Sequence, residues 1–305
     1  MFIIVLSLCA ILICPLMRAP ELLWSNAVIA TAACACTIRS FTLMGQGVWE
    51  TQTLLFSLGI GASSWLAYTW QRHVKSTRKK GLRPDHLEWH RARWPAIRLL
   101  AWVIFPLALI PALLSILALA QGRTGMDLPT AVIFGSALGM TLLYAGWPGE
   151  QGARFALRRI PGLKMMWVGL SWATITAAWP AWWSGALESM PADSMAMLIG
   201  ERFLIITALT LPFDLRDRQW DPSSMKNWST GLGTWGTRAL ALTCLIAANG
   251  LLWTESEGSL WWAMAGTVPM CIAVLAARED RPAHYFGFLD GLLILDALWI
   301  CFWVG

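Results

Sequence analysis

The stretch with the most evident chemical potential is LPFDLRDRQWD, residues 211–221, where a long apolar run ends. It carries Asp214, Asp217 and Asp221, and a helix of about 3.6 residues per turn would place all three within an arc of about 60°. Clustered carboxylates suit Mg²⁺, which takes oxygen ligands and shares its remaining positions with substrate phosphates. The plainer alternative is a solvated helix end in which Asp214 pairs with Arg218.

The composition indicates the kind of scaffold that must hold these residues. The chain is 57% hydrophobic and 13% charged, whereas soluble domains carry about 25% charged residues. Its apolar runs do not alternate with polar residues as the strands of a membrane barrel would. We therefore predict an all-α, polytopic integral membrane helix bundle. The net charge of +5 does not indicate nucleic-acid binding, because Lys and Arg in a membrane protein mostly record its orientation.

The apolar runs between polar breaks predict the transmembrane segments. They are 2–17, 22–40, 52–71, 96–120, 128–147, 163–184, 195–213, 234–254, 259–277 and 285–304. The first run is short, contains Pro15 and lacks the positive region of a signal peptide. We expect residues 1–21 to form an extra hydrophobic segment, either a further helix or one on the membrane surface. Residues 22–305 then form one domain of nine core transmembrane helices.

The distribution of Lys and Arg predicts the orientation of the bundle. All but three of the 23 basic residues fall on one side of the predicted spans, and the exceptions are Arg39, Arg123 and Arg202. The basic side is expected to be cytoplasmic. We predict a protein of a bacterial inner (cytoplasmic) membrane, with the aspartates on the cytoplasmic side. The basic loop 72–98 either records this orientation only or also binds anionic lipid head groups.

The aspartate stretch and the residues after it, LPFDLRDRQWD…KNWSTGLG, resemble the second aspartate motif of the UbiA superfamily of intramembrane prenyltransferases. That motif has the form DxxDxxxD and continues with a basic residue, a Thr and a Gly. The three aspartates match its carboxylates, and Lys226, Thr230 and Gly233 fall where the trailing pattern expects them. Residues 142–173 and 285–295 are similar to further parts of the family.

The resemblance implies a chemistry and a set of site residues. Family members bind an isoprenyl diphosphate through Mg²⁺ held between two aspartate motifs, and the allylic cation formed on ionisation is attacked by a lipid-soluble acceptor. For this chain, the resemblance implies that Asp214, Asp217 and Asp221 bind the metal. Phosphate contacts are expected from Lys226, Arg72 and Lys164, and the span ends at Arg72 and Asp214 should face one another.

The first aspartate motif of the family is absent. It should end the second core helix, but SSWLAYTWQRHVKSTRKK, residues 63–80, holds no Asp, Asn or Glu. Gln71, Arg72, His73 and Lys75 stand there instead. One hypothesis is that basic residues contact the diphosphate directly, as Arg and Lys can without a metal. The alternative is that the chain is a catalytically silent relative that binds a lipid or a partner protein.

Two acids inside the last predicted span are further candidates, since charges within a membrane are often functional. Asp290 begins about 9 Å into the span, at 1.5 Å per residue, and is expected to face a cytoplasmic cavity near the aspartate motif. Asp296 lies deeper and is expected to be protonated or paired, with Arg238 a candidate partner for one of the two acids. A transporter would use both acids for ion coupling, but the chain shows no clear pair of broken helices in two halves.

The remaining patterns have simpler interpretations. GSALG, Gly135 to Gly139, predicts close helix packing. The seven cysteines are interpreted as small apolar residues. Tryptophans such as Trp182 and Trp183, near predicted helix ends, are interpreted as an interfacial belt.

Overall fold

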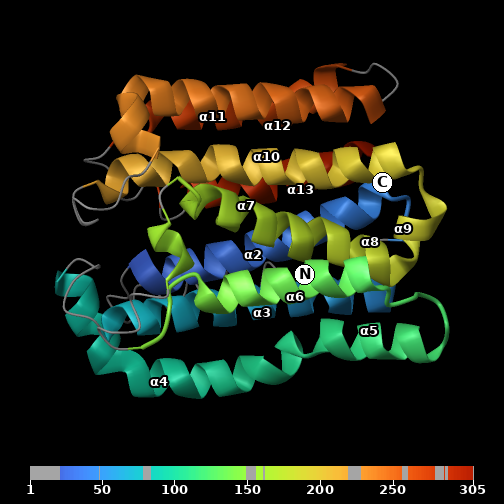
Figure 1. Cartoon of the computed structure of the whole chain (residues 1–305), viewed down its shortest axis with the longest axis horizontal. Coiled ribbons are helices and arrows are strands. Elements are labelled where there is room, and N and C mark those ends of the chain that lie inside the picture. Colours follow the sequence, from blue (N-terminus) through green and yellow to red (C-terminus); the bar gives the residue numbers. More distant parts are fainter. Residues whose placement is uncertain are drawn as a thin grey trace.

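The computed structural model describes residues 21–47, 49–77, 84–148, 156–160, 162–218, 228–255, 260–278, 285 and 288–304. Throughout these ranges the regular structure is helical, without a strand, which confirms the predicted all-α class. The predicted N-terminal segment at 2–17 lies outside them. The helices run along one common axis and stack side by side, with α4 and α5 along one edge and α11 and α12 along the other (Figure 1).

The helix bounds agree with the predicted spans. The long elements are α2 (Glu21–Leu43), α3 (Thr51–Ser76), α4 (Pro84–Ala108), α5 (Ile110–Ala120), α6 (Leu128–Leu143), α7 (Lys164–Ala173), α10 (Ala192–Asp217), α11 (Trp228–Glu255), α12 (Leu260–Ala276) and α13 (Leu289–Val304). Short helices α8 (Trp179–Ser184) and α9 (Ala186–Ser189) and a 3₁₀ turn, η2 (Leu157–Arg159), complete the described part. Each predicted span from residue 22 onward coincides with one helix or with consecutive helices.

Proline and π-helical geometry explain where two spans are interrupted. The span predicted at 96–120 is divided into α4 and α5, with Pro106 and Pro111 on either side of the break, because proline lacks the N–H that a continuous helix needs. The span at 163–184 consists of α7, a π-helical turn, η3 (Thr174–Ala178), and α8. A π-turn inside an α-helix accommodates one extra residue without ending the helix.

Four helical stretches are long and apolar enough to cross a membrane. They are Ser25–Leu43, Glu88–Ala120, Ala192–Asp217 and Trp228–Leu252. The first of these is 72% buried inside the bundle, whereas the α4–α5 stretch is only 17% buried. The exposed side chains of α4 and α5 are largely apolar, for example Trp102 and Val103. An apolar outer surface of this kind is what contact with lipid requires.

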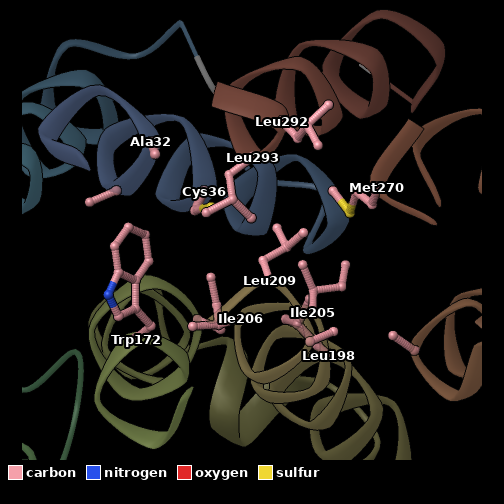
Figure 2. Packing of buried hydrophobic residues seen from close by; sticks show 14 of the residues in the cluster. Ala32, Cys36, Trp172, Leu198, Ile205, Ile206, Leu209, Met270, Leu292 and Leu293 are labelled. Carbon is pink, nitrogen blue, oxygen red and sulfur yellow. The ribbon is translucent and has the colours of Figure 1, made fainter. Parts of the chain in front are cut away.

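Most of the described helices contribute apolar side chains to the core, namely α2, α3, α7, α8, α10, α11, α12 and α13 among others. Figure 2 shows Cys36 of α2 and Leu293 of α13 above Ile206 and Leu209 of α10. Gly61 of α3 lets that helix approach α2 closely, because a Cβ there would lie 2.8 Å from the backbone oxygen of Ala30. The core is thus built around α2, the first described helix of the chain.

Two interpretations of packing patterns are wrong. A Cβ added at Gly135 or Gly139 would meet nothing within 4 Å, so GSALG is not a site of close packing between the described helices. Trp182 and Trp183 are buried and not interfacial. Trp183 stacks on Phe56 with 4.8 Å between ring centroids, and the indole of Trp182 donates to the backbone oxygen of Gly125. Their position near a helix end did not indicate that the end of α8 is buried against neighbouring segments of the bundle.

Candidate functional site

The ends of α3 and α10 and the start of α7 meet at one end of the bundle, at the left in Figure 1. There the first residue of α7, Lys164, reaches across to α10. Its Nζ lies 2.8 Å from Asp214 Oδ1 and 2.9 Å from Asp217 Oδ2. The two aspartates therefore share one face of α10, as their spacing predicts, and one buried ammonium bridges them.

Arg216 also holds Asp217. Its Nε and Nη2 lie 2.9 and 2.7 Å from Asp217 Oδ1. The guanidinium is 4.9 Å from the ring centroid of Phe213 and 5.3 Å from that of Tyr285, which are cation–π distances. Two different cations thus bind the two oxygens of the Asp217 carboxylate.

Hydrogen bonds connect the end of α10 to the start of α11. The hydroxyl of Ser229 donates to the backbone oxygen of Asp214 at 3.0 Å. Arg218 donates to the backbone oxygen of Ser229 and, at 3.3 Å, to the hydroxyl of Thr234. The bond from Ser229 satisfies a backbone oxygen in the last turn of α10, where carbonyls have no partner within their own helix.

Basic residues at the end of α3 face this group. Arg72 donates to the hydroxyl of Ser25 at 2.8 Å, and its charge interacts with those of Arg216 and Asp290. The end of α3 therefore lies at the same end of the bundle as the end of α10 (Figure 1), within electrostatic range of Arg216 and Asp290. That Arg72 and Asp214 face one shared site stays a prediction.

Lys75 lies one turn beyond Arg72 on α3. Its ammonium is 5.9 Å from the ring centroid of Tyr144, and its charge interacts with those of Asp217, Lys164 and Arg158. Arg72 and Lys75 of α3 and Arg158 of the 3₁₀ turn η2 thus form one row of cations, which we call the basic wall.

We call this group of eight charged residues the polar-end site. It consists of the cations Arg72, Lys75, Arg158, Lys164 and Arg216 and the carboxylates Asp214, Asp217 and Asp290. Positive charge exceeds negative charge in this set. Asp221 and Lys226, which were predicted to belong to the site, lie outside the described residues.

The described residues of the polar-end site bring together two of the three predicted metal ligands, Asp214 and Asp217, and cations already pair with both. They contain no group of three or more His, Cys, Asp or Glu side chains placed to hold a metal ion. Both oxygens of Asp217 and Oδ1 of Asp214 already accept from Lys164 or Arg216. A divalent cation would have to displace the Lys164 ammonium or lie against it, and like charges at such distances repel strongly. An anion with several charges fits the basic wall better.

Sequence reasoning missed Arg158 and Arg216 of the polar-end site, and it missed Tyr285, whose ring lies 5.3 Å from the Arg216 guanidinium. The sequence pattern could have indicated only the part of the site that lies on α3. Tyr68, Arg72 and Lys75 are spaced by four and three residues, so they share one face of a helix. Arg158 and Tyr285 come from distant segments, and no local pattern links them to the aspartates.

A second group of charges is buried inside the bundle. The guanidinium of Arg39 lies 3.1 and 2.7 Å from the two oxygens of Glu201, and its Nε lies 2.8 Å from Asp296 Oδ2. Arg202 donates to the sulfur of Cys36 at 2.9 Å. Arg39, Glu201, Asp296 and Arg202 form a charge-balanced set, which we call the buried ion cluster.

The buried ion cluster bears on three expectations. Arg39 and Arg202 were counted toward the side of the membrane opposite the cytoplasm; both lie within helices, α2 and α10, and are fully buried in the bundle. The partner of Asp296 is Arg39; Arg238 instead donates to the backbone oxygen of Ala277 at 2.6 Å. Cys36 is buried as expected, but it also serves as a hydrogen-bond acceptor.

Comparison with known proteins adds no further assignment. No family model, curated protein or solved structure matches the chain. The UbiA resemblance of the aspartate stretch stays a prediction, and the geometry of the site carries the functional argument.

Proposed function

We propose that the chain is an integral membrane protein of nine core helices, similar to the UbiA superfamily, that binds an isoprenyl diphosphate at the polar-end site. The observation that carries the proposal is the excess of positive charge where α3, α7 and α10 meet. Arg and Lys bind phosphate oxygens directly through charge-assisted hydrogen bonds. Arg72 and Lys75 would contact the phosphates, while Lys164 holds the two aspartates.

The surroundings of the site suit an isoprenoid. One turn deeper on α3, the hydroxyl of Tyr68 accepts from the indole of Trp172 at 3.4 Å, and Trp65 beyond it is buried. The side chains thus change from charged to aromatic over two turns. A ligand with an anionic head and an apolar tail is complementary to this order. The four apolar helices support a membrane location, and the predicted orientation places the site on the cytoplasmic side.

Prenyl transfer to a lipid-soluble acceptor is the second candidate function. It is favoured by the position of Asp214 and Asp217 on one face of α10, next to the basic wall. In such a reaction the C–O bond to the diphosphate breaks, and the bonding electrons leave with the phosphate oxygen. The acceptor attacks the allylic cation and loses a proton. In this chain Arg72, Lys75 and Lys164 would stabilise the leaving diphosphate.

A binding measurement tests the first proposal. Purified protein in detergent is titrated with geranylgeranyl diphosphate, once with Mg²⁺ and once with EDTA. We expect binding in both conditions, weakened about tenfold or more by Arg72→Gln or Lys75→Gln, because one charged hydrogen bond is lost. Arg98→Gln, an equal charge change at an exposed position of α4, is the matched control. Absence of binding, or equal binding by all variants, would refute the proposal.

The same titration separates direct phosphate binding from metal-mediated binding. If binding needs Mg²⁺ and is lost in Asp214→Asn, the carboxylates hold a metal and the direct contact is wrong. Release of diphosphate on adding candidate acceptors then tests transfer. If the wild-type protein binds geranylgeranyl diphosphate but releases no diphosphate, the chain is a catalytically silent relative that only binds the ligand.

A further inference from the structure

A cavity of about 380 Å³ lies between α12 and α13, away from the polar-end site. Its lining includes Gly266 and Pro269 of α12 and Leu292, Asp296 and Trp299 of α13. Asp296 is the one charged residue in the lining, and the rest are aliphatic, aromatic, proline or glycine. The volume falls in the range of about 300–1,000 Å³ that small-molecule sites occupy.

The carboxylate of Asp296 has two different sides. Oδ2 faces the bundle interior, where Arg39 Nε lies 2.8 Å away. Oδ1 faces α12 at Gly266, since a Cβ added there would be 2.5 Å from it. Among the described residues, Arg39 is the one ion-pair or hydrogen-bond partner of Asp296. Oδ1 is therefore an acceptor at the cavity wall.

An acceptor in this position favours a ligand that can donate a hydrogen bond. A carboxylate oxygen at an apolar, lipid-facing surface has no bulk water to satisfy it, and leaving it without a donor is costly. The charges of the buried ion cluster already balance, so a ligand in the cavity does not need to be a cation. A neutral hydroxyl group can donate a hydrogen bond to Oδ1 and adds no charge.

The outer rim of the cavity indicates how a ligand would enter. Leu295, Leu298 and Phe302 line it and are 60%, 61% and 78% exposed. In a membrane these side chains lie against lipid tails, so an apolar molecule could reach the cavity from the bilayer. Trp299 offers an aromatic surface inside it.

We propose that this cavity binds a lipid-soluble alcohol or phenol. Its hydroxyl donates to Asp296 Oδ1, and its hydrocarbon part packs against Leu292, Pro269 and Trp299. Gly266 is required because any larger residue would occupy the space next to Oδ1. The site is independent of the diphosphate site proposed above, since the two share no residue.

A matched pair of ligands tests the proposal without any mutation. Binding of para-hexylphenol and of its methyl ether is measured on wild type in phosphatidylcholine nanodiscs, with empty nanodiscs subtracted. The ether keeps the shape and apolar surface but has no O–H. We expect it to bind about tenfold to a hundredfold more weakly, as a charge-assisted hydrogen bond implies. Equal binding of both ligands would mean a slot for hydrocarbon only and would overturn the proposal.

Variants then locate the binding. Ala265→Phe places a ring in the cavity without removing any charge of the buried ion cluster, and it should abolish phenol binding. Ala112→Phe, the same change at an exposed position of α5, is the control and should leave it unchanged. Size-exclusion chromatography and circular dichroism check that both variants fold. Phenol binding that survives Ala265→Phe, or that both variants lose equally, contradicts the assignment to this cavity.

Discussion

Replacing Lys164 by methionine should destabilise the polar end of the bundle and should raise its affinity for Mg²⁺ above that of the wild type. The ammonium lies within 2.9 Å of Asp214 and Asp217, and Asp214 is fully buried. Methionine has a similar length but no charge, so the substitution removes the cation and keeps most of the packing. Breaking a buried ion pair by removing one partner costs about 3–5 kcal/mol. Because Arg216 still pairs with Asp217, we expect a loss of about 3 kcal/mol, at the lower end of this range.

The free energy of unfolding, measured in detergent by tryptophan fluorescence and circular dichroism, tests this magnitude. In Lys164→Met with Asp214→Asn, the unpaired charge is removed as well, so most of the lost stability should return. The difference between the double variant and the two single variants gives the interaction energy. A single variant as stable as wild type would show that the pair contributes nothing.

The effect of Mg²⁺ on stability distinguishes neutralisation of Asp214 and Asp217 by the Lys164 ammonium from neutralisation by a bound metal ion. In Lys164→Met the two carboxylates no longer share an ammonium, so millimolar Mg²⁺ should stabilise this variant in proportion to its binding. Wild type should gain little, because Lys164 already occupies the position between them. If wild type gains as much as the variant, and Asp214→Asn removes that gain, then a metal displaces Lys164 and our reasoning about the site is refuted.

Three further predictions concern the scaffold. Arg39→Met leaves two buried carboxylates without their cation and should cost about 3–5 kcal/mol in unfolding free energy, whereas the exposed Arg98→Met should change it little. Gly61→Ala should destabilise the α2–α3 contact, because the new Cβ would lie 2.8 Å from a backbone oxygen of α2, while Gly139→Ala meets open space and should leave unfolding midpoints unchanged or raised. The pKa of Asp127, which caps α6, is lowered from 3.8 by hydrogen bonds from Thr130, so the cap is intact above that pH and is lost as the pH falls further. The protection of amides in the first turn of α6, relative to their intrinsic exchange rates, should decrease there, and Asp127→Ala should abolish this pH dependence.

Periodicity and hydropathy predicted the scaffold because they depend on neighbouring residues. The apolar runs located the helices, and the spacing of Asp214 and Asp217 placed them on one face of α10. The position of Arg72 at a helix end was also predictable, although α3 continues to Ser76 and so carries Lys75 within the helix. In these cases the determining residues lie within a few turns of each other.

The charge pairings could not be predicted in the same way. Arg39 and Glu201 are 162 positions apart, and nothing in either helix alone specifies the partner. The rule that counts basic residues on each side of the membrane concerns orientation only, so it gave no indication that Arg39 and Arg202 are buried inside the bundle. Likewise, Lys164 was expected to contact phosphate, and nothing in its own segment predicts that it pairs with Asp214 and Asp217.

The buried ion cluster has a consequence for the order in which the protein is made. Arg39 belongs to the first described helix, but its two carboxylates arrive with α10 and α13, which follow much later in the chain. If α2 enters a bilayer during synthesis, it carries a guanidinium there before its partners exist, and an unpaired arginine in a bilayer is costly. Glu201 of α10 is the first carboxylate to reach Arg39, and the cluster is complete only with Asp296 of α13, so a ribosome stalled before α13 would leave the cluster with an excess of positive charge.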